Sequence, residues 1–269
     1  MGVKISAFII ARNEAARIGR TLEAVSWVDQ IVLVDSGSTD ATIAIAKEAG
    51  AEVHHRDWEG YGPQKVYAEG LCSNDWVLNV DADEVVTEDL ALEIKAAAEG
   101  APAAYRTRIL NVYPGDDRPR PLANDYNVVR FYHRSAGSYR DHPLFDRVDV
   151  QGDERQLRAP IHHYPLLSFA HFVDKENRYS SYAAETATAR GRTALLLRLP
   201  FEMPFAFLKF YFARRHFLGG WKGFMFSLIA SFARTLRIAK MLERQDGESP
   251  GQKNDNAMNF PVDGSGTNL

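Results

Sequence analysis

The sequence is almost devoid of cysteine, since Cys72 is the only one among 269 residues. An intramolecular disulfide is therefore excluded, and the composition fits a reducing compartment, which makes the cytoplasm the expected location. Long apolar runs are missing as well. The longest uncharged, apolar-rich window is residues 223–233, whereas a helix that crosses a bilayer needs about 20 residues. We therefore expect no transmembrane segment.

The net charge of −3 hides a strong asymmetry along the chain. From Arg190 to Arg244 there are eleven Lys and Arg residues but only two acids, Glu202 and Glu243. Phe, Leu, Trp and Met accompany these charges, which favours amphipathic helices at an anionic membrane surface over a nucleic-acid interface. The alternative is a helical subdomain that packs its apolar face on the rest of the protein. Both interpretations can hold together.

Residues 1–100 alternate between strand-like and helix-like patterns. Continuous apolar strands interleaved with helices are typical of a parallel sheet that is covered on both faces. The fold class is therefore expected to be α/β, with a mainly parallel sheet and helices on both faces. The predicted strands are residues 4–11, 30–35, 52–58 and 75–84, and the predicted helices are 13–28, 42–50 and 62–72.

The later part of the chain is less regular. Residues 104–113 and 127–134 are predicted strands, separated by a proline-rich loop over 114–125. Helical patterns follow from residue 166 onwards. Residues 245–269 are polar and rich in Gly and Asn, which predicts a disordered tail.

Three acids follow predicted strands. Asp35 ends one strand, and Asp81 and Asp83 follow another. Ligands of α/β sheets bind beyond the carboxyl ends of the strands. Unpaired carboxylates gathered there would repel one another, so a bound cation is the economical explanation. Mg²⁺ or Mn²⁺, which prefer oxygen ligands and are often completed by substrate phosphates, suit this site.

The segment "VDSGSTDAT", residues 34–42, is open to two interpretations. It can be a strand, a turn and a helix capped by Ser38, Thr39 or Asp40. Taken with "DADE" at residues 81–84 and "ARNE" at 11–14, it resembles the signature of family 2 glycosyltransferases with the GT-A fold.

Four further segments are similar to the lipopolysaccharide-core branch of that family, the WaaE/KdtX-like proteins. They are residues 57–68, 75–84, 161–164 and 177–184, and the similarity covers roughly residues 3–240. Val66 departs from the pattern, because an Asn commonly follows the Gln-Lys pair. The resemblance implies a GT-A catalytic domain over 1–165, with a nucleotide-sugar half over about 1–100 and an acceptor half over about 101–165. A helical C-terminal unit over 166–244 and the tail 245–269 complete the expected organisation.

The resemblance also implies roles for individual residues. Asp35 would hold the nucleotide base, and Asp83 would be the direct metal ligand. His163 would approach the metal or the diphosphate, although His162 is an alternative match. Lys65 would meet the phosphates, unless it is merely an exposed helical lysine. The remaining nucleotide-sugar-binding residues are expected to be Ala11, Arg12, Asn13, Glu14, Gln64, Asp81 and Ala82.

The catalytic base is expected to be Asp146. Inverting transfer needs a carboxylate within hydrogen-bond reach of the acceptor hydroxyl. Where relatives read Val-His-Glu, this sequence has Phe145 and Asp146 at the matching places of "PLFDRV". The carboxylate is thus retained, but the histidine is lost. Asp141 remains a second candidate.

The resemblance implies an inverting, metal-dependent glycosyltransferase. Its donor would be a UDP-hexose such as UDP-glucose, and its acceptor a lipopolysaccharide core or another lipid-linked saccharide, reached at the inner face of the cytoplasmic membrane. The Gln-x-x-Arg-Trp signature of processive synthases is missing, which favours addition of one sugar. The alternatives are a Mg²⁺-dependent phosphoryl hydrolase or nucleotidyltransferase, and a non-catalytic nucleotide-sugar-binding module.

Overall fold

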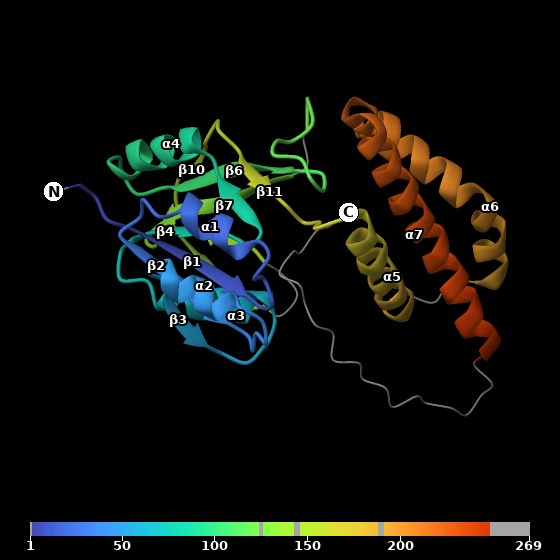
Figure 1. Cartoon of the computed structure of the whole chain (residues 1–269), viewed down its shortest axis with the longest axis horizontal. Coiled ribbons are helices and arrows are strands. Elements are labelled where there is room, and N and C mark those ends of the chain that lie inside the picture. The colour runs from blue at the N-terminus through green and yellow to red at the C-terminus, as the bar shows by residue number, and fades with distance from the viewer. Residues whose placement is uncertain (1, 124–125, 143–145, 188–190, 248–269) are drawn as a thin grey trace. The chain divides into compact units, whose positions relative to one another are not determined.

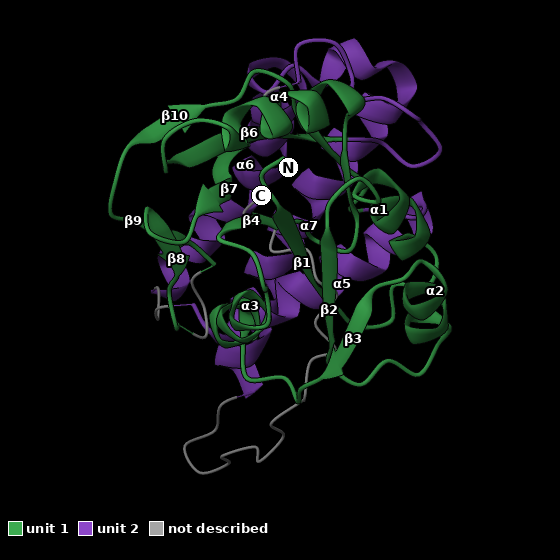
Figure 2. Cartoon of the chain, turned by 90° about the vertical axis from the view of Figure 1, so that its left-hand side faces the viewer, with its two compact units in different colours: residues 1–111, 124–165, 261–269 green, residues 112–123, 166–260 purple. Residues whose placement is uncertain are grey.

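The computed structural model describes residues 2–123, 126–142, 146–187 and 191–247 (Figure 1). They form two compact units (Figure 2). Among the described residues, the first unit comprises 2–111 and 126–165, and the second comprises 112–123 and 166–247. The proline-rich segment 112–123 therefore groups with the C-terminal helices, which the sequence-based boundary at 165 did not anticipate. Phe145 and most of the expected tail lie outside the described residues.

The first unit is built on one large, mainly parallel sheet. Its strand order is β3-β2-β1-β4-β7-β6-β11-β5, with β10 beside β6. The antiparallel pairings involve β7 with β4 and β6, and β5 with β11. The strands are β1 Ile5–Ala11, β2 Gln30–Asp35, β3 Glu52–His55, β4 Trp76–Asn79, β5 Glu84–Val86, β6 Ala104–Asn111, β7 Tyr126–His133, β10 Glu154–Gln156 and β11 Ile161–His163. A separate antiparallel pair joins β8 Gly137–Tyr139 to β9 Val148–Val150.

The sheet is covered on both faces, as the apolar strands predicted. Every residue of β1 is buried, and alternate side chains enter two different cores. Ile9 packs in the core that includes residues of the helices α1 Ile18–Ala24, α2 Thr42–Glu48 and α4 Glu88–Ala98. Phe8 packs in the core that includes Ala68 of α3 Tyr61–Gly70. The site described below therefore rests on strands fixed from both sides.

Several predicted elements are shorter than the sequence indicated, and two of these changes create loops at the carboxyl edge of the sheet. The first helix begins at Ile18 rather than near Asn13, because Asn13 has a positive φ of 56° that ends any regular helix there. Strand β4 ends at Asn79, so Asp81 and Asp83 lie in the turn between β4 and β5. Both loops carry predicted site residues.

The second unit is helical. It contains α5 Phe169–Glu185, α6 Arg192–Leu208, a π-helical turn over Lys209–Ala213, a 3₁₀ turn over His216–Gly219 and α7 Gly220–Gly247. Its larger core joins Phe172, Phe210 and Phe226. Helices α5 and α6 both pack on α7. None of the helices in the described part of the chain has both the length and the apolar content of a membrane span.

Candidate active site

The predicted site residues gather where three parallel strands end. In the sheet, Ala11 at the end of β1 pairs with Asp35 at the end of β2, and Phe8 pairs with Asn79 at the end of β4. Because these strands run in the same direction, Asp35 and the turn that carries Asp81 and Asp83 lie at one edge of the sheet. The sequence predicted this shared edge for the three acids.

Asp35 is buried and only partly satisfied. Its Oδ2 atom accepts hydrogen bonds of 2.9 Å from the backbone N–H groups of Gly37 and Ser38. These bonds fold the start of the turn back over the strand end. Its Oδ1 atom is buried and has no hydrogen-bond partner among the described residues. The free oxygen is an acceptor for an N–H group of a ligand.

The loop after β1 is fastened to this turn. The Asn13 backbone N–H donates to Ser38 Oγ at 2.9 Å, and Asn13 Oδ1 accepts from the Thr39 backbone N–H at 2.8 Å. The Ala11 carbonyl accepts from the backbone N–H of Ser36. The two loops that the family resemblance assigns to the nucleotide thus form one cross-linked surface.

Two other residues of that loop, Glu14 and Arg12, differ in how many of their polar atoms have partners. Glu14 is buried and forms an ion pair with Arg17 at 2.6 Å, while its backbone N–H donates to Thr42 Oγ1 at 2.8 Å. The contacts of Glu14 therefore stabilise the loop. Arg12 has a buried Nε atom without a partner among the described residues, so this guanidinium retains a donor.

Lys65 is completely buried at the centre of the site. Its Nζ atom donates to Asn79 Oδ1 at 3.1 Å, Asp81 Oδ1 at 2.8 Å and Asp146 Oδ2 at 2.7 Å. Burial alone would lower the pKa of Lys65, but the charges of Asp146 and Asp81 outweigh it and raise the pKa. The alternative of an exposed helical lysine is wrong. All three donors of the ammonium are occupied, so contact with a phosphate would require one of them to be released.

Arg130 on β7 is a site residue that the sequence analysis missed. Its Nη2 atom lies 2.6 Å from Asp81 Oδ2 and 2.6 Å from Glu84 Oε1. Burial raises the pKa of Asp81, but the charges of Arg130 and Lys65 outweigh it and hold the pKa well below the usual value. A single charge within the apolar strand "YNVVRFYH" was the available signal. Its partner could not be identified because it lies 49 residues earlier in the chain.

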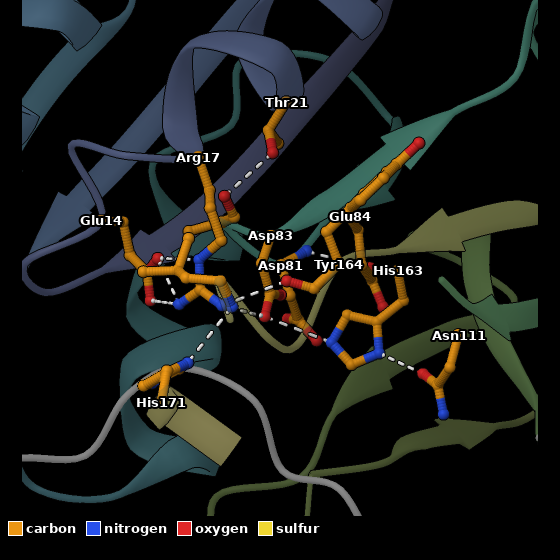
Figure 3. A network of polar contacts seen from close by, with 12 residues as sticks. Glu14, Arg17, Thr21, Asp81, Asp83, Glu84, Asn111, His163, Tyr164 and His171 are labelled. Atoms are coloured by element: carbon orange, nitrogen blue, oxygen red, sulfur yellow. Dashed lines mark hydrogen bonds and ion pairs between the residues drawn. The ribbon is translucent and has the colours of Figure 1, made fainter. Parts of the chain in front are cut away.

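Asp83 lies between two cationic groups (Figure 3). Its Oδ2 atom is 3.2 Å from His163 Nε2 and 3.3 Å from Arg17 Nη1. The other nitrogen of His163, Nδ1, lies 2.7 Å from Asn111 Oδ1. Burial lowers the pKa of His163, but the charge of Asp83 outweighs it and raises the pKa. The imidazolium can therefore donate to both oxygens.

The alternation along β11 distinguishes the two candidate histidines. His163 is buried and faces Asp83, whereas the neighbouring His162 is half-buried. Successive side chains of a strand point to opposite faces. His163 is therefore the histidine that the structure brings to the acidic turn.

The residues around Asp83 can hold a divalent cation only together with a ligand. Within the described ranges, no group of three or more His, Cys, Asp or Glu side chains is arranged to bind a metal ion. Both oxygens of Asp81 are occupied by Lys65 and Arg130. Asp83 keeps a buried Oδ1 atom without a partner among the described residues. The free Asp83 oxygen fits Mg²⁺ or Mn²⁺ that completes its shell with phosphate oxygens and water. His163 could join as a ligand only after its Nε2 atom releases its proton, because an imidazolium has no free lone pair.

Asp146 reaches the same cluster through Lys65. Its Oδ2 atom accepts from Lys65 Nζ, while its Oδ1 atom is buried and has no partner in the part of the chain that the structure describes. Asp141, the second candidate for the base, is exposed. The structure therefore brings Asp146, and not Asp141, into the acidic cluster.

Gln64 and Ala82 connect the site loops to neighbouring helices. The Gln64 Nε2 group donates to Ser36 Oγ at 2.7 Å, which joins helix α3 to the Asp35 turn. Its Oε1 atom has no partner among the described residues. Ala82 is buried, and its carbonyl accepts from Thr21 Oγ1 at 2.9 Å. Ala82 thus fixes the turn between Asp81 and Asp83 through its backbone.

Comparison with known proteins identifies the family of this chain. Residues 6–153 match the sequence profile of glycosyl transferase family 2. An uncharacterized glycosyltransferase of Rickettsia felis is 40% identical over 254 residues, covering 89% of this chain and 90% of that protein. Another, RP128 of Rickettsia prowazekii, is 38% identical over 97% of this chain and 94% of its own length.

A relative with a more specific name is the lipopolysaccharide core biosynthesis glycosyltransferase LpsC of Rhizobium meliloti. It is 30% identical over 254 residues, which cover 89% of this chain and 92% of LpsC. The profile match spans more than half of the chain and contains the loops that carry Asp35, Asp83 and Asp146. The chain is a glycosyltransferase and belongs to glycosyl transferase family 2.

Proposed function

We propose that this enzyme transfers a hexose from a UDP-sugar to a lipid-linked saccharide, with inversion at the anomeric carbon and with help from Mg²⁺ or Mn²⁺. One observation carries the proposal. Asp35, Asp83 and Asp146 come from three separate segments, and each keeps one buried carboxylate oxygen without a partner among the described residues. Buried acceptors are normally satisfied, so three such oxygens mark positions that a ligand completes.

The donor assignment rests on Asp35. Its unpartnered Oδ1 atom can accept the ring N–H of uracil, while the Gly37 and Ser38 amides hold its other oxygen in place. Adenine and cytosine lack a ring N–H of this kind on their pairing edge, whereas uracil, thymine and guanine each carry one. A uridine nucleotide therefore suits the pocket, and UDP-glucose is the hexose donor that we propose.

The transfer step rests on Asp146. Its free Oδ1 atom would accept the proton of the acceptor hydroxyl as that oxygen attacks the anomeric carbon, and the bond to the nucleoside diphosphate breaks on the opposite face. Lys65 holds the second oxygen of Asp146 and so fixes the direction of the first. A divalent ion held by Asp83 and His163 would supply charge stabilisation for the departing diphosphate.

The acceptor assignment rests on the likeness to LpsC, whose name places it in lipopolysaccharide core biosynthesis. We propose a lipopolysaccharide-core or other lipid-linked saccharide, met at the inner face of the cytoplasmic membrane. A nucleic acid is not proposed as a partner.

Two other functions are less well supported. An aspartyl-phosphate hydrolase carries its paired acids at the first strand, whereas Asp81 and Asp83 follow β4. A non-catalytic binding module has no need of a carboxylate at the acceptor position, yet Asp146 is present with a free oxygen.

A panel of radiolabelled nucleotide sugars, incubated with Mg²⁺ or Mn²⁺, tests the proposal. We expect UDP-hexoses to be hydrolysed or transferred and sugars carried on ADP or CMP to stay intact. A silent panel with both metals would favour the binding module. Phosphate release from simple phosphate esters, without consumption of any nucleotide sugar, would favour a hydrolase.

A further inference from the structure

Helix α6 exposes a row of large apolar side chains and buries an acid. An ordinary surface helix buries its apolar face and exposes its charged one. In α6 the buried side chains include Glu202, which accepts from Arg198 at 2.5 Å and from Arg234 of α7 at 2.8 Å. The side chains that point to solvent are Leu197, 69% exposed, and Phe201 and Phe205, 59% and 68% exposed. Two arginines neutralise the charge of Glu202, whereas the outer face of α6 keeps these apolar side chains more than half exposed among the described residues.

The exposed apolar positions form a continuous stripe. Residues 197, 201, 205 and 208 are separated by four, four and three positions, which places them along one side of α6, and residue 212 follows in the π-helical turn. All five are at least half exposed. The exposed aromatic residues continue into the start of α7. We call this set the aromatic stripe, and its members are Leu197, Phe201, Phe205, Leu208, Phe212, Phe217, Trp221 and Phe224.

Positive charge accompanies the aromatic stripe. Lys209, Arg214 and Arg215 are exposed and lie between its members in the sequence. The only acid from residue 191 to residue 242 is Glu202, which is buried and paired. Residues 191–242 therefore contribute exposed rings and cations, and the acid that approaches from segment 112–123, Asp116, is paired with Lys222.

We propose that the aromatic stripe lies in the interfacial layer of an anionic bilayer, with α6 parallel to the membrane plane. Phe, Leu and Trp would enter the boundary between headgroups and acyl chains, and the three cations would meet anionic headgroups. Pro200 and Pro204 remove two backbone N–H donors within α6, which leaves two carbonyls without their usual helical partners. Water at the interface can satisfy these carbonyls, whereas the hydrocarbon core cannot.

Charge decides between a lipid surface and a second copy of this chain. A symmetric dimer through the aromatic stripe would bring Lys209, Arg214 and Arg215 of both copies together without acids to neutralise them. An anionic membrane supplies the missing negative charge. The proposed lipid-linked acceptor explains why the enzyme would bind a membrane, and in this respect the inference rests on the proposed function. The surface itself is identified without reference to donor or acceptor.

Sedimentation with vesicles tests this inference on the full-length chain, without nucleotide sugar. We expect binding to phosphatidylglycerol-containing vesicles, weaker binding to pure phosphatidylcholine, and weakening of the first by salt. The double variant F201S/F205S should bind at least about tenfold more weakly, because burying even part of two phenyl rings is worth more than that factor. The matched control is Leu92→Ser on α4, a 65% exposed residue outside the stripe, which should bind like the wild type.

A second variant separates the charge from the rings. R214Q/R215N should lose most of the preference for anionic vesicles while keeping residual binding; Asn is chosen because Arg215 has a φ of 59°. Circular dichroism checks that each variant is folded. Equal vesicle binding by the wild type and F201S/F205S, or no binding by the wild type, would overturn the inference. So would a dimer in light scattering that F201S/F205S dissociates. Nucleotide-sugar hydrolysis, measured separately, reports failure of the proposed function alone.

Discussion

The Nζ atom of Lys65 lies 2.7 Å from Asp146 Oδ2, and the two residues are 81 positions apart in the chain. The same ammonium donates to Asp81 at 2.8 Å. One buried cation therefore joins the candidate base to the acidic turn after β4. In the proposed mechanism the acceptor side and the donor side share this positioning residue, so changes at Lys65 should affect both stability and turnover.

Replacing Lys65 by Met tests this link. The substitution removes one cation and leaves Asp81 paired only with Arg130 and Asp146 without its lysine. Breaking a buried ion pair in this way should lower the free energy of unfolding by about 3–5 kcal/mol and abolish turnover. Urea unfolding measures the first effect. Lys47→Met on the exposed side of α2 is the control and should stay within about 0.5 kcal/mol of the wild type. An equal, small change in both variants would contradict the burial of Lys65.

Asp146→Asn should separate donor binding from transfer. The amide keeps the size of the side chain but cannot take the proton of the acceptor hydroxyl, so kcat should fall by about 10²–10⁴. UDP binding, measured by calorimetry, should change little. Asp141→Asn is the matched comparison, because Asp141 is the second candidate for the base and its side chain is exposed. Loss of transfer in Asp141→Asn with full activity in Asp146→Asn would reverse the assignment.

Gly62 holds helix α3 close to the segment that leads to Asp146. A Cβ atom at Gly62 would lie 2.3 Å from the carbonyl oxygen of His142 and 2.6 Å from that of Arg140. Both neighbours are backbone atoms, so Gly62→Ala must displace them, and it should lower both the thermal midpoint and kcat. Gly70→Ala in the same helix is the control, since nothing lies within 4 Å of its added Cβ. That variant should be as stable as the wild type, or slightly more so.

The second unit should lose stability in mild acid through His216. Burial and the nearby Arg120 and Arg214 lower the pKa of His216 to about 3, while the unfolded chain titrates near 6.5. The stability contributed by this depressed pKa is present above about pH 6.5 and is lost as the pH falls towards 3. It amounts to about 3 kcal/mol between pH 7 and pH 4.

His216→Phe checks this effect, because a phenyl ring can keep the stacking on Phe226, whose ring centroid lies 4.5 Å from that of His216. Urea unfolding at pH 7 and pH 4 should show a smaller loss in the variant than in the wild type. The same loss in both proteins would mean that His216 is already accessible to protons in the folded state.

The strands and acids of the first unit could be predicted from local sequence, but their partners could not. Continuous apolar runs indicated β1, β2 and β4, and the polar residues that follow them indicated the edge where Asp35, Asp81 and Asp83 lie. From the sequence, a metal ion was the expected partner of the negative charge at that edge. The structure shows instead that Asp81 is neutralised by Lys65 and Arg130.

This difference has a physical cause. Arg130 reaches Asp81 because β7 inserts antiparallel beside β4, and that pairing is decided by contacts between residues far apart in the chain. No local pattern specifies it. The same holds for residues 112–123, whose grouping with the C-terminal helices depends on tertiary packing such as the hydrogen bond between Tyr113 and His216.

Calorimetric titration of UDP into the wild-type protein and Asp83→Asn, each with Mn²⁺ and with a chelator, tests the central claim most directly. Asn keeps the shape of the side chain beside Arg17 and His163 but removes the charge that a cation requires. We predict that Mn²⁺ strengthens UDP binding at least about tenfold in the wild type and has no effect in Asp83→Asn, while Asp146→Asn keeps the full effect. UDP binding that is indifferent to Mn²⁺ in the wild type, or a Mn²⁺ effect that survives in Asp83→Asn, would contradict the account.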